Sequence, residues 1–173
     1  MSVPAPAKLR VSGLQEAHVD SVLAIDTVVK TEHQSHGADA APLTLKELAQ
    51  LPRKHNVRVA EADDVPVGFG AWRDEEPGVG VVEELSVLPP YREHGVAEAL
   101  LDKFREEARA AGIQHLVVRA WEASPSSKDA FLALHFRPLP AELPDTLARW
   151  LELTEAAGPV TLPGQVLLHA LVN

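Results

Sequence analysis

A segment near the middle of the chain combines residue types that can bind a phosphate group. Residues 85–97 read LSVLPPYREHGVA, and a helical repeat of apolar residues begins at Gly95. Two prolines end the preceding strand, because proline cannot donate to a sheet ladder. The N–H groups at a helix start carry about half a positive charge and bind anions. Arg92 adds a cation, while Gly95 and Ala97 let a phosphate approach the backbone. The pattern predicts a pyrophosphate site; an ordinary strand-to-helix connection is the alternative.

Two adjacent acids, Glu83 and Glu84, lie in the strand that precedes this loop. Neighbouring strand residues point to opposite faces of a sheet, so we expect one acid to face a substrate cleft and the other to face solvent or a helix. A carboxylate in such a cleft can accept a proton from a reacting amine. A pair of solubilising charges is the alternative. A β-bulge in the strand would shift the facing by one residue.

The spacing of Arg92, Gly95 and Ala97 resembles the acyl-CoA pyrophosphate loop, Arg/Gln-x-x-Gly-x-Gly/Ala, of the GNAT superfamily of N-acetyltransferases. Residues 57–70 are similar to the second and third strands of that family, and EELSV at 83–87 is similar to its fourth. The likeness covers roughly residues 9–140. It implies an N-acetyltransferase that moves an acetyl group from acetyl-CoA directly to a primary amine of a small molecule or peptide. Transfer would occur in a ternary complex and without a metal.

The resemblance also implies a role for each position of the motif. Leu85 and Val87 would hydrogen-bond the pantetheine arm of the coenzyme through their backbone. Glu83 stands where the family often has a glutamate base, so it is the preferred base, with Glu84 second. A CoA-binding regulatory module with weak or no catalysis is the alternative function. The pyrophosphate would be held by the backbone of Arg92, Glu93, His94, Gly95, Val96 and Ala97.

Three positions after the fifth strand depart from the family pattern. When Phe136 is aligned with the family's last phenylalanine, Ser124 takes an asparagine position, Phe131 a tyrosine position and His135 a glycine position. Ser124 and Phe131 are still expected to contact the coenzyme. Phe131 has no proton to give to the leaving thiolate, but a thiol of pKa about 8.5 leaves tolerably near neutral pH. His135 is either a substitute acid or an ordinary boundary histidine.

Alternating and helical apolar repeats predict the elements that must position these residues. The expected class is α+β (mixed α/β): a central sheet, mostly antiparallel and partly parallel, flanked by helices as in the GNAT-like acyl-CoA N-acyltransferase fold. A helix joins the strand at Val87 to the strand at Leu116, so these two strands should be parallel. The expected strands are 9–14, 56–60, 65–72, 79–88, 115–121 and 165–172, and the expected helices are 15–29, 44–51, 95–111, 126–134 and 144–157.

A single domain is expected over residues 9–173, after a flexible tail at 1–8. Residues 138–164 are expected to form a helical insertion before the last strand. This helix would cover the acceptor site, form a homodimer contact, or pack its Leu and Trp stripe on the sheet. Glu32, His33 and His36 have a spacing that metal ligands can have, but a polar surface loop without a metal is expected there.

The overall composition excludes several functions. A formal charge of −9 argues against nucleic-acid binding and slightly favours a cationic amine as the acceptor. The sequence has no cysteine, which excludes disulfides and an acyl-cysteine intermediate. No run of about 18 apolar residues occurs, so no membrane contact is expected. The proline-containing start lacks the apolar core of a signal peptide. A cytoplasmic protein is therefore expected.

Overall fold

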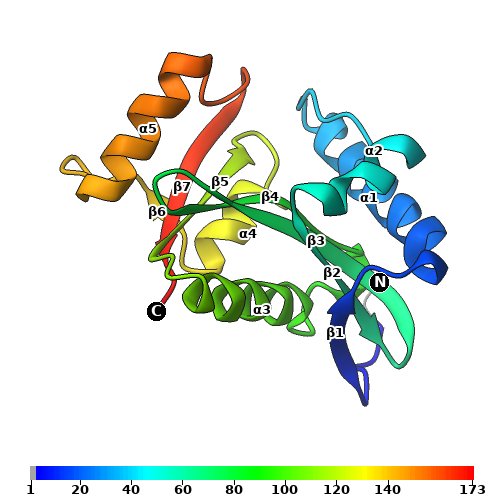
Figure 1. The fold of residues 1–173 in the computed structure, drawn as a ribbon. Coiled ribbons are helices and arrows are strands. Elements are labelled where there is room, and N and C mark those ends of the chain that lie inside the picture. Colours follow the sequence, from blue (N-terminus) through cyan, green and yellow to red (C-terminus); the bar gives the residue numbers. More distant parts are fainter. Residues whose placement is uncertain (1–2) are drawn as a thin grey trace.

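The computed structural model describes residues 3–173, which form one mixed sheet with helices on both faces (Figure 1). The strand order is β1-β2-β3-β4-β5-β7-β6, and neighbouring strands are antiparallel except for the parallel pair β4 and β5. The predicted class, and the predicted parallel pair joined by a helix, are confirmed. The strands are β1 (Leu9–Gly13), β2 (Asn56–Ala62), β3 (Val65–Glu75), β4 (Val79–Val87), β5 (His115–Trp121), β6 (Arg137–Pro138) and β7 (Gln165–Leu171).

The helices divide between the two faces of the sheet. One face carries α1 and α2 over β2 and β3, and also α5 over β4 and β5; the other face carries α3 and α4 (Figure 1). On the first face, α1 therefore lies over one half of the sheet and α5 over the other half. The helices are α1 (Val19–Ser35), α2 (Leu45–Gln50), α3 (Val96–Ala110), α4 (Lys128–Ala133) and α5 (Asp145–Ala157).

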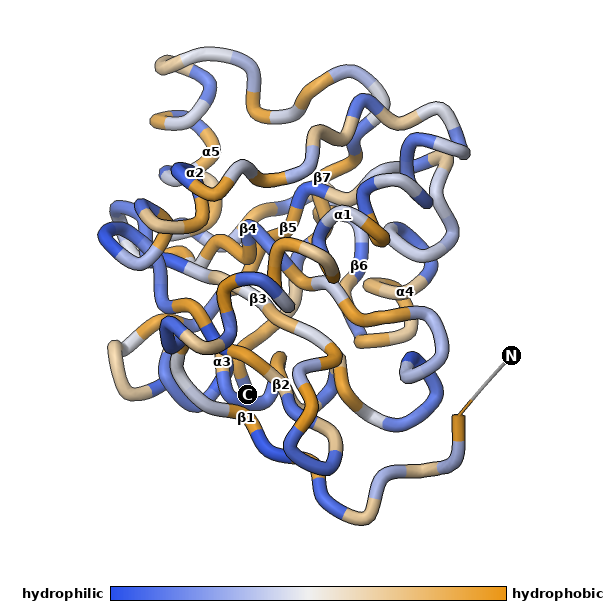
Figure 2. Tube along the Cα trace, turned by 90° about the vertical axis from the view of Figure 1, so that its right-hand side faces the viewer, coloured by the Kyte–Doolittle hydropathy of each residue, from blue (hydrophilic) through white to orange (hydrophobic). Residues whose placement is uncertain are grey.

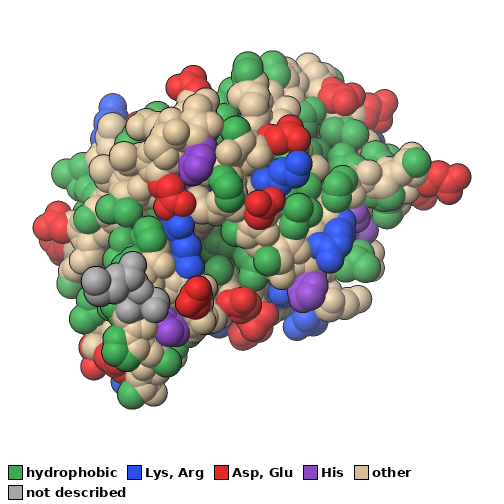
Figure 3. Space-filling view, turned by 180° about the vertical axis from the view of Figure 1, so that it is seen from behind, with side chains coloured by type: hydrophobic (Ala, Val, Ile, Leu, Met, Phe, Trp, Pro, Cys, Tyr) green, Lys and Arg blue, Asp and Glu red, His purple; other side chains and the backbone are tan. Residues whose placement is uncertain are grey.

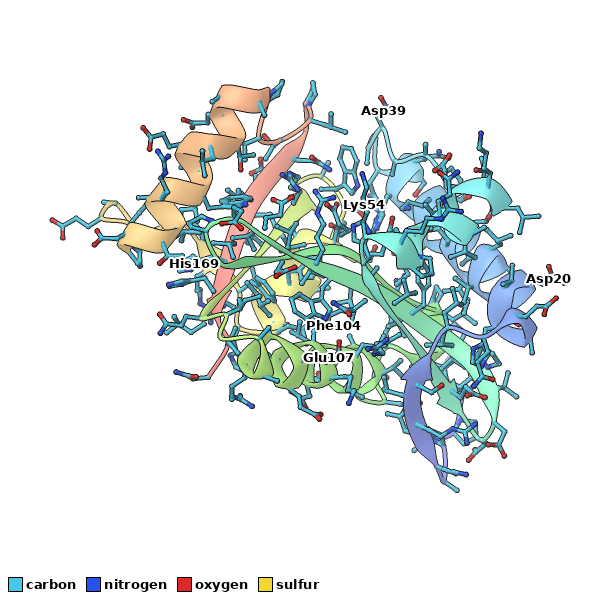
Figure 4. The ribbon with its side chains drawn as sticks, viewed as in Figure 1. Asp20, Asp39, Lys54, Phe104, Glu107 and His169 are labelled. Atoms are coloured by element: carbon cyan, nitrogen blue, oxygen red, sulfur yellow. The ribbon has the colours of Figure 1, made fainter. Side chains whose placement is uncertain are left out.

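The helix α3 packs on the sheet through the four-residue repeat that predicted it. Val96, Leu100, Phe104 and Ala108 are each fully buried. Phe104 and Glu107 both extend from α3 toward the sheet (Figure 4). Close packing requires a glycine opposite Phe104, because a Cβ at Gly70 would lie 2.6 Å from its Cζ atom. This packing fixes where α3 begins relative to β4.

The other face is covered by two separate apolar clusters. Val22 and Ile25 of α1 pack against Val59 and Phe69 of the sheet. The α5 cluster consists of Leu147 and Trp150 on Val79, Val81 and Val117, so the Leu and Trp stripe of this helix packs on the sheet. Figure 2 shows the corresponding hydrophobic stretches along the central strands, with hydrophilic stretches common in the outer loops.

Two predictions about the N-terminal half need correction or remain open. A polar loop was expected from Glu32, but α1 continues to Ser35, because the buried positions recur from Val29 to His33. Residues 1–2 of the predicted flexible tail lie outside the described residues. Within the rest of that segment, the backbone N–H of Val3 donates to Pro90 O at 3.4 Å.

Candidate active site

The parallel strands β4 and β5 separate halfway along their length. Val79–Val82 pair with His115–Val118, and the described part of the chain gives β4 no β5 partner beyond Val82. The edge of β4 from Glu83 to Val87 therefore faces an opening between the two strands. Backbone N–H and C=O groups on such an edge are available to a ligand.

A β-bulge in β4 places both glutamates on the same face of the sheet. Ala71 pairs with Glu84 while the next residue of β3, Trp72, pairs with Val82, so Glu83 is the extra residue. Glu84 contacts Lys30 of α1, and Glu83 contacts Arg73 of β3. The expectation that the two acids point to opposite faces is therefore wrong, because a bulge interrupts the alternation of side chains.

Glu84 has the more perturbed environment of the two acids. Its carboxylate lies 3.4 Å from Lys30 Nζ, and the same ammonium lies 2.8 Å from Asp26 Oδ1. Burial raises the pKa of Glu84 to about 7, and the nearby Lys30 charge opposes this rise only in part. Burial lowers the pKa of Lys30, but the charges and hydrogen bonds of Glu84 and Asp26 together outweigh it and hold that pKa above its ordinary value. A carboxylate that titrates near neutral pH suits general base catalysis.

Glu83 lies beside one cation and one imidazole. Arg73 Nη2 is 3.1 Å from its carboxylate, and His55 Nε2 is 4.0 Å away. Burial lowers the pKa of His55, so the nearby imidazole is mostly neutral at neutral pH. Among the described residues, His55 Nε2 and Arg73 Nε are buried atoms without a hydrogen-bond partner. Arg73 holds the Glu83 carboxylate in place, and Glu83 also lines the cleft, where it can accept a hydrogen bond.

The loop after β4 presents an uncapped helix start, as the motif predicted for a phosphate site. Gly95 precedes α3 with φ of +73°, and no side chain of the described chain caps the helix there. The left-handed conformation favours glycine. A Cβ at this position would have only Glu98 Oε2 within 4 Å, at 3.8 Å, so the space beside the loop is open. The first N–H groups of α3 are therefore available to an anion.

The remaining loop residues are placed differently from one another. Val96 is fully buried, so only its backbone can contact a ligand, whereas Glu93 is exposed. His94 Nε2 lies 2.7 Å from Val3 O, so the imidazole of His94 is already hydrogen-bonded to the backbone. Arg92 donates from Nε to Val87 O at 3.1 Å and from Nη1 to Glu32 at 2.9 Å. A phosphate at the loop would therefore share Arg92 with Glu32.

Two adjoining cavities connect this loop to the glutamates. The first, which we call the outer groove, has a volume of about 160 Å³ and runs past Val87, Arg92 and Ala97. The second, which we call the inner cavity, has about 60 Å³ and contains Glu83 and Glu84. Both cavities are lined by Leu85, Ser126 and Phe131. Figure 3 shows a hollow with hydrophobic side chains near the middle of the rear face, with a basic and an acidic side chain beside it.

The residues after β5 only partly follow the sequence prediction. Phe131 lines both cavities, but Ser124 is fully buried and lines neither. Its hydroxyl lies 2.7 Å from His33 Nδ1. His135 has φ of +71°, which explains why the family favours glycine there, and it lines a different cavity with Arg105 and Arg137. His135 lines neither of the two cavities near the glutamates, which favours an ordinary boundary histidine over a substitute acid.

Sequence reasoning missed three polar groups that gather at this site. His33 is 7 % exposed and lines the inner cavity, not a surface loop. Lys30 lines the same cavity, and Glu32 is bonded to Arg92. The four-residue spacing from Val29 to His33 could have indicated that the helix continues. Burial lowers the pKa of His33 despite the opposing charge of Glu32.

Metal and membrane features are absent from the described residues. Within residues 3–173, no group of three or more His, Cys, Asp or Glu side chains is arranged to hold a metal ion. The helices of that same range are all too short or too polar to cross a membrane.

The sequence and fold together identify the family. A model described as the acetyltransferase (GNAT) family matches residues 21–136, which is more than half of the chain. The chain therefore belongs to the GNAT family of acetyltransferases, and so to the acyltransferases. A comparison with curated proteins finds no match.

Solved structures of this family share the fold across nearly the whole chain. The PaiA N-acetyltransferase from Thermoplasma acidophilum in complex with coenzyme A has a TM-score of 0.70 at 10 % identity, covering 95 % of this chain and 99 % of that chain. The ribosomal-protein-S18-alanine N-acetyltransferase from Escherichia coli has a TM-score of 0.64 at 14 % identity, covering 96 % of this chain and 95 % of that chain. An aminoglycoside 6′-acetyltransferase type Ii has a TM-score of 0.63 at 11 % identity, covering 95 % of this chain and 97 % of that chain.

Proposed function

We propose that the protein transfers an acetyl group from acetyl-CoA directly to a primary amine of a small molecule or peptide, in a ternary complex. The observation that carries this proposal is the continuity of the site. An uncapped helix start at Gly95 opens into the outer groove, and the outer groove adjoins the inner cavity that holds Glu84. A coenzyme bound by its diphosphate at the loop would direct its thioester toward the carboxylates.

The residues of the site fit a CoA diphosphate and pantetheine arm. Free N–H groups of α3 match a diphosphate, and the open edge of β4 at Leu85 matches the peptide-like arm. At Val87 the carbonyl already accepts from Arg92 Nε, so the arm would share it with Arg92 or use the Val87 N–H. Glu84 is the stronger candidate for the base, because its pKa of about 7 leaves it about half ionised at neutral pH. Glu83, ion-paired with Arg73, is then suited to orient the amine.

The transfer itself needs few protein groups. The amine nitrogen attacks the thioester carbon, the C–N bond forms, and the C–S bond breaks with departure of the CoA thiolate. The proton lost by the amine passes to the carboxylate of Glu84, directly or through water, and then to solvent. The absence of cysteine from the sequence agrees with direct attack.

The charge of the cleft does not single out a cationic acceptor. Glu83 and Glu84 are each matched by a cation, Arg73 and Lys30, and Arg119 adds a further positive charge to the inner cavity. The net charge of −9 favoured a cationic acceptor, but the charges inside the cleft do not support that preference. An acetylation screen over cationic, neutral and anionic amines would identify the acceptor class.

Calorimetry with acetyl-CoA and with CoA tests the proposal. Both ligands should bind at concentrations well below millimolar, and Gly95→Glu should abolish binding by placing a charged side chain where the diphosphate lies. Gly112→Glu is the matched control: Gly112 also has positive φ, at +78°, but follows the far end of α3. Failure of the wild-type protein to bind either ligand would refute the function.

One observation favours a second function, a CoA-binding regulatory module without efficient catalysis. Phe131 lines both cavities at the position where related enzymes often have a tyrosine. This function would show as tight CoA binding without acetyl transfer to any amine in a broad panel. Turnover with one amine of the panel would exclude it.

A further inference from the structure

A hydroxyl group lies at the junction between the outer groove and the inner cavity. Ser126 is half-buried and lines both cavities, together with the apolar side chains of Leu85 and Phe131. If the proposed function holds, the coenzyme passes this junction with its sulfur, because the diphosphate lies on one side and Glu84 on the other. Among the side chains that line both cavities, only Ser126 can donate a hydrogen bond.

Ser126 belongs to a short hydrogen-bonded chain that begins on α1. His33 Nδ1 lies 2.7 Å from Ser124 Oγ, and Ser124 Oγ lies 3.3 Å from Ser126 Oγ. His33 is 7 % exposed and Ser124 is fully buried, so both are shielded from water. If Nδ1 carries the imidazole proton, His33 donates to Ser124 and Ser124 donates to Ser126. The Ser126 proton can then go to a third acceptor, which without coenzyme is the Glu32 carboxylate, whose pKa this hydrogen bond helps to lower. Each bond in such a chain polarises the next.

We propose that Ser126 donates a hydrogen bond to the coenzyme sulfur as the thiolate leaves, and that His33 and Ser124 are positioning residues for this donor. No proton transfer from serine is required. The C–S bond breaks, the electron pair stays on sulfur, and the Ser126 hydroxyl stabilises that charge until the thiolate takes a proton from solvent. The proton of the amine leaves separately through Glu84. Ser126 would thus stabilise the leaving thiolate, which Phe131 cannot do because its side chain has no polar atom.

Titration of the bound CoA thiol tests this inference without an acceptor amine. The thiolate is followed by ultraviolet absorbance, with the S-methyl thioether of CoA as the blank. Ser126→Ala should raise the pKa of the bound thiol by about one to two units, because a hydrogen bond to a charged group changes an equilibrium roughly tenfold to a hundredfold. Ser126→Thr keeps a hydroxyl and should restore most of the difference.

The positioning role predicts a graded series at His33. His33→Leu should raise the bound-thiol pKa by about half as much as Ser126→Ala. His36→Leu, at an exposed residue just after the same helix, should leave it unchanged. With a reactive amine, kcat should fall in the same order, roughly tenfold or more for Ser126→Ala. The Kd of CoA should change little in each variant.

The outcomes separate this inference from the proposed function. A wild-type protein that binds no CoA would overturn both. Normal CoA binding with the same thiol pKa in wild type and Ser126→Ala would overturn the sulfur donor alone. A loss in His33→Leu without any loss in Ser126→Ala would also overturn it, because His33 would then act by another route. Thermal unfolding of each variant shows whether a change in thiol pKa or kcat comes from misfolding. If Ser126→Ala misfolds, the comparison of Ser126→Thr with wild type decides, because threonine keeps the hydroxyl and should keep the thiol pKa.

Discussion

Replacement of Glu84 by Gln should remove the base and flatten the pH dependence of the reaction. With a pKa of about 7, Glu84 is ionised in roughly a tenth of molecules near pH 6 and in roughly nine tenths near pH 8. If the ternary complex keeps this pKa, the wild-type kcat should rise about ninefold across that range, because the base works in its ionised form. Glu84→Gln should lower kcat near pH 8 by about 10²-fold or more and leave little slope with pH.

The measurement is kcat at saturating acetyl-CoA and saturating amine, because kcat reports ionisations in the ternary complex and not that of the free amine. Lys30 also lies 2.8 Å from Asp26, so the cluster should retain one ion pair in the variant. Glu83→Gln is the matched control on the same face of β4. It should chiefly raise KM for the amine and preserve the pH profile.

Two results would refute this reasoning. A pH profile that persists in Glu84→Gln and disappears in Glu83→Gln would make Glu83 the base, as the family resemblance first indicated. A fall in rate explained wholly by weaker acetyl-CoA binding would mean that Glu84 shapes the cavity without accepting a proton.

Three other substitutions test the binding loop and the fold. Glu32→Gln should free Arg92 and strengthen CoA binding about twofold to fivefold in calorimetry; weaker binding would show that Glu32 orders the loop instead. Thr44→Ala should cost about 1 kcal/mol in urea unfolding, because Thr44 caps α2 by accepting from Glu47 N, and no loss would contradict the cap. Gly70→Ala should cost about 1 to 3 kcal/mol because its Cβ would meet Phe104 at 2.6 Å. Gly13→Ala should cost much less, because its Cβ would meet an Arg58 nitrogen only at 3.9 Å.

Local patterns were sufficient to predict most elements of the fold. The apolar repeat of α3 and the alternation of the strands each depend on residues a few positions apart. The strand β5 was predicted with its observed bounds, His115–Trp121. The family motif likewise located the loop at Gly95, because the positive φ at that residue is a local requirement.

The bulge at Glu83 could not be predicted in the same way. A bulge depends on how β4 pairs with β3, and the alternation of apolar residues in β4 continues on both sides of the two acids. Sequence reasoning could name a bulge as the cause of an error but could not locate it. The choice between Glu83 and Glu84 therefore required the register of the sheet and the burial of each carboxylate.

The reaction end of the site is defined by contacts that no local pattern contains. Lys30, Glu32 and His33 lie within one turn of α1 and contact Glu84, Arg92 and Ser124, which are 54, 60 and 91 residues away. These contacts join β4, the loop before α3 and the segment after β5 through a single helix end. In the proposed function the loop motif serves coenzyme binding, whereas this turn of α1 borders the place where amine and thioester would meet. Differences in acceptor and rate within the fold should therefore follow changes in the last turns of α1 more closely than changes in the loop.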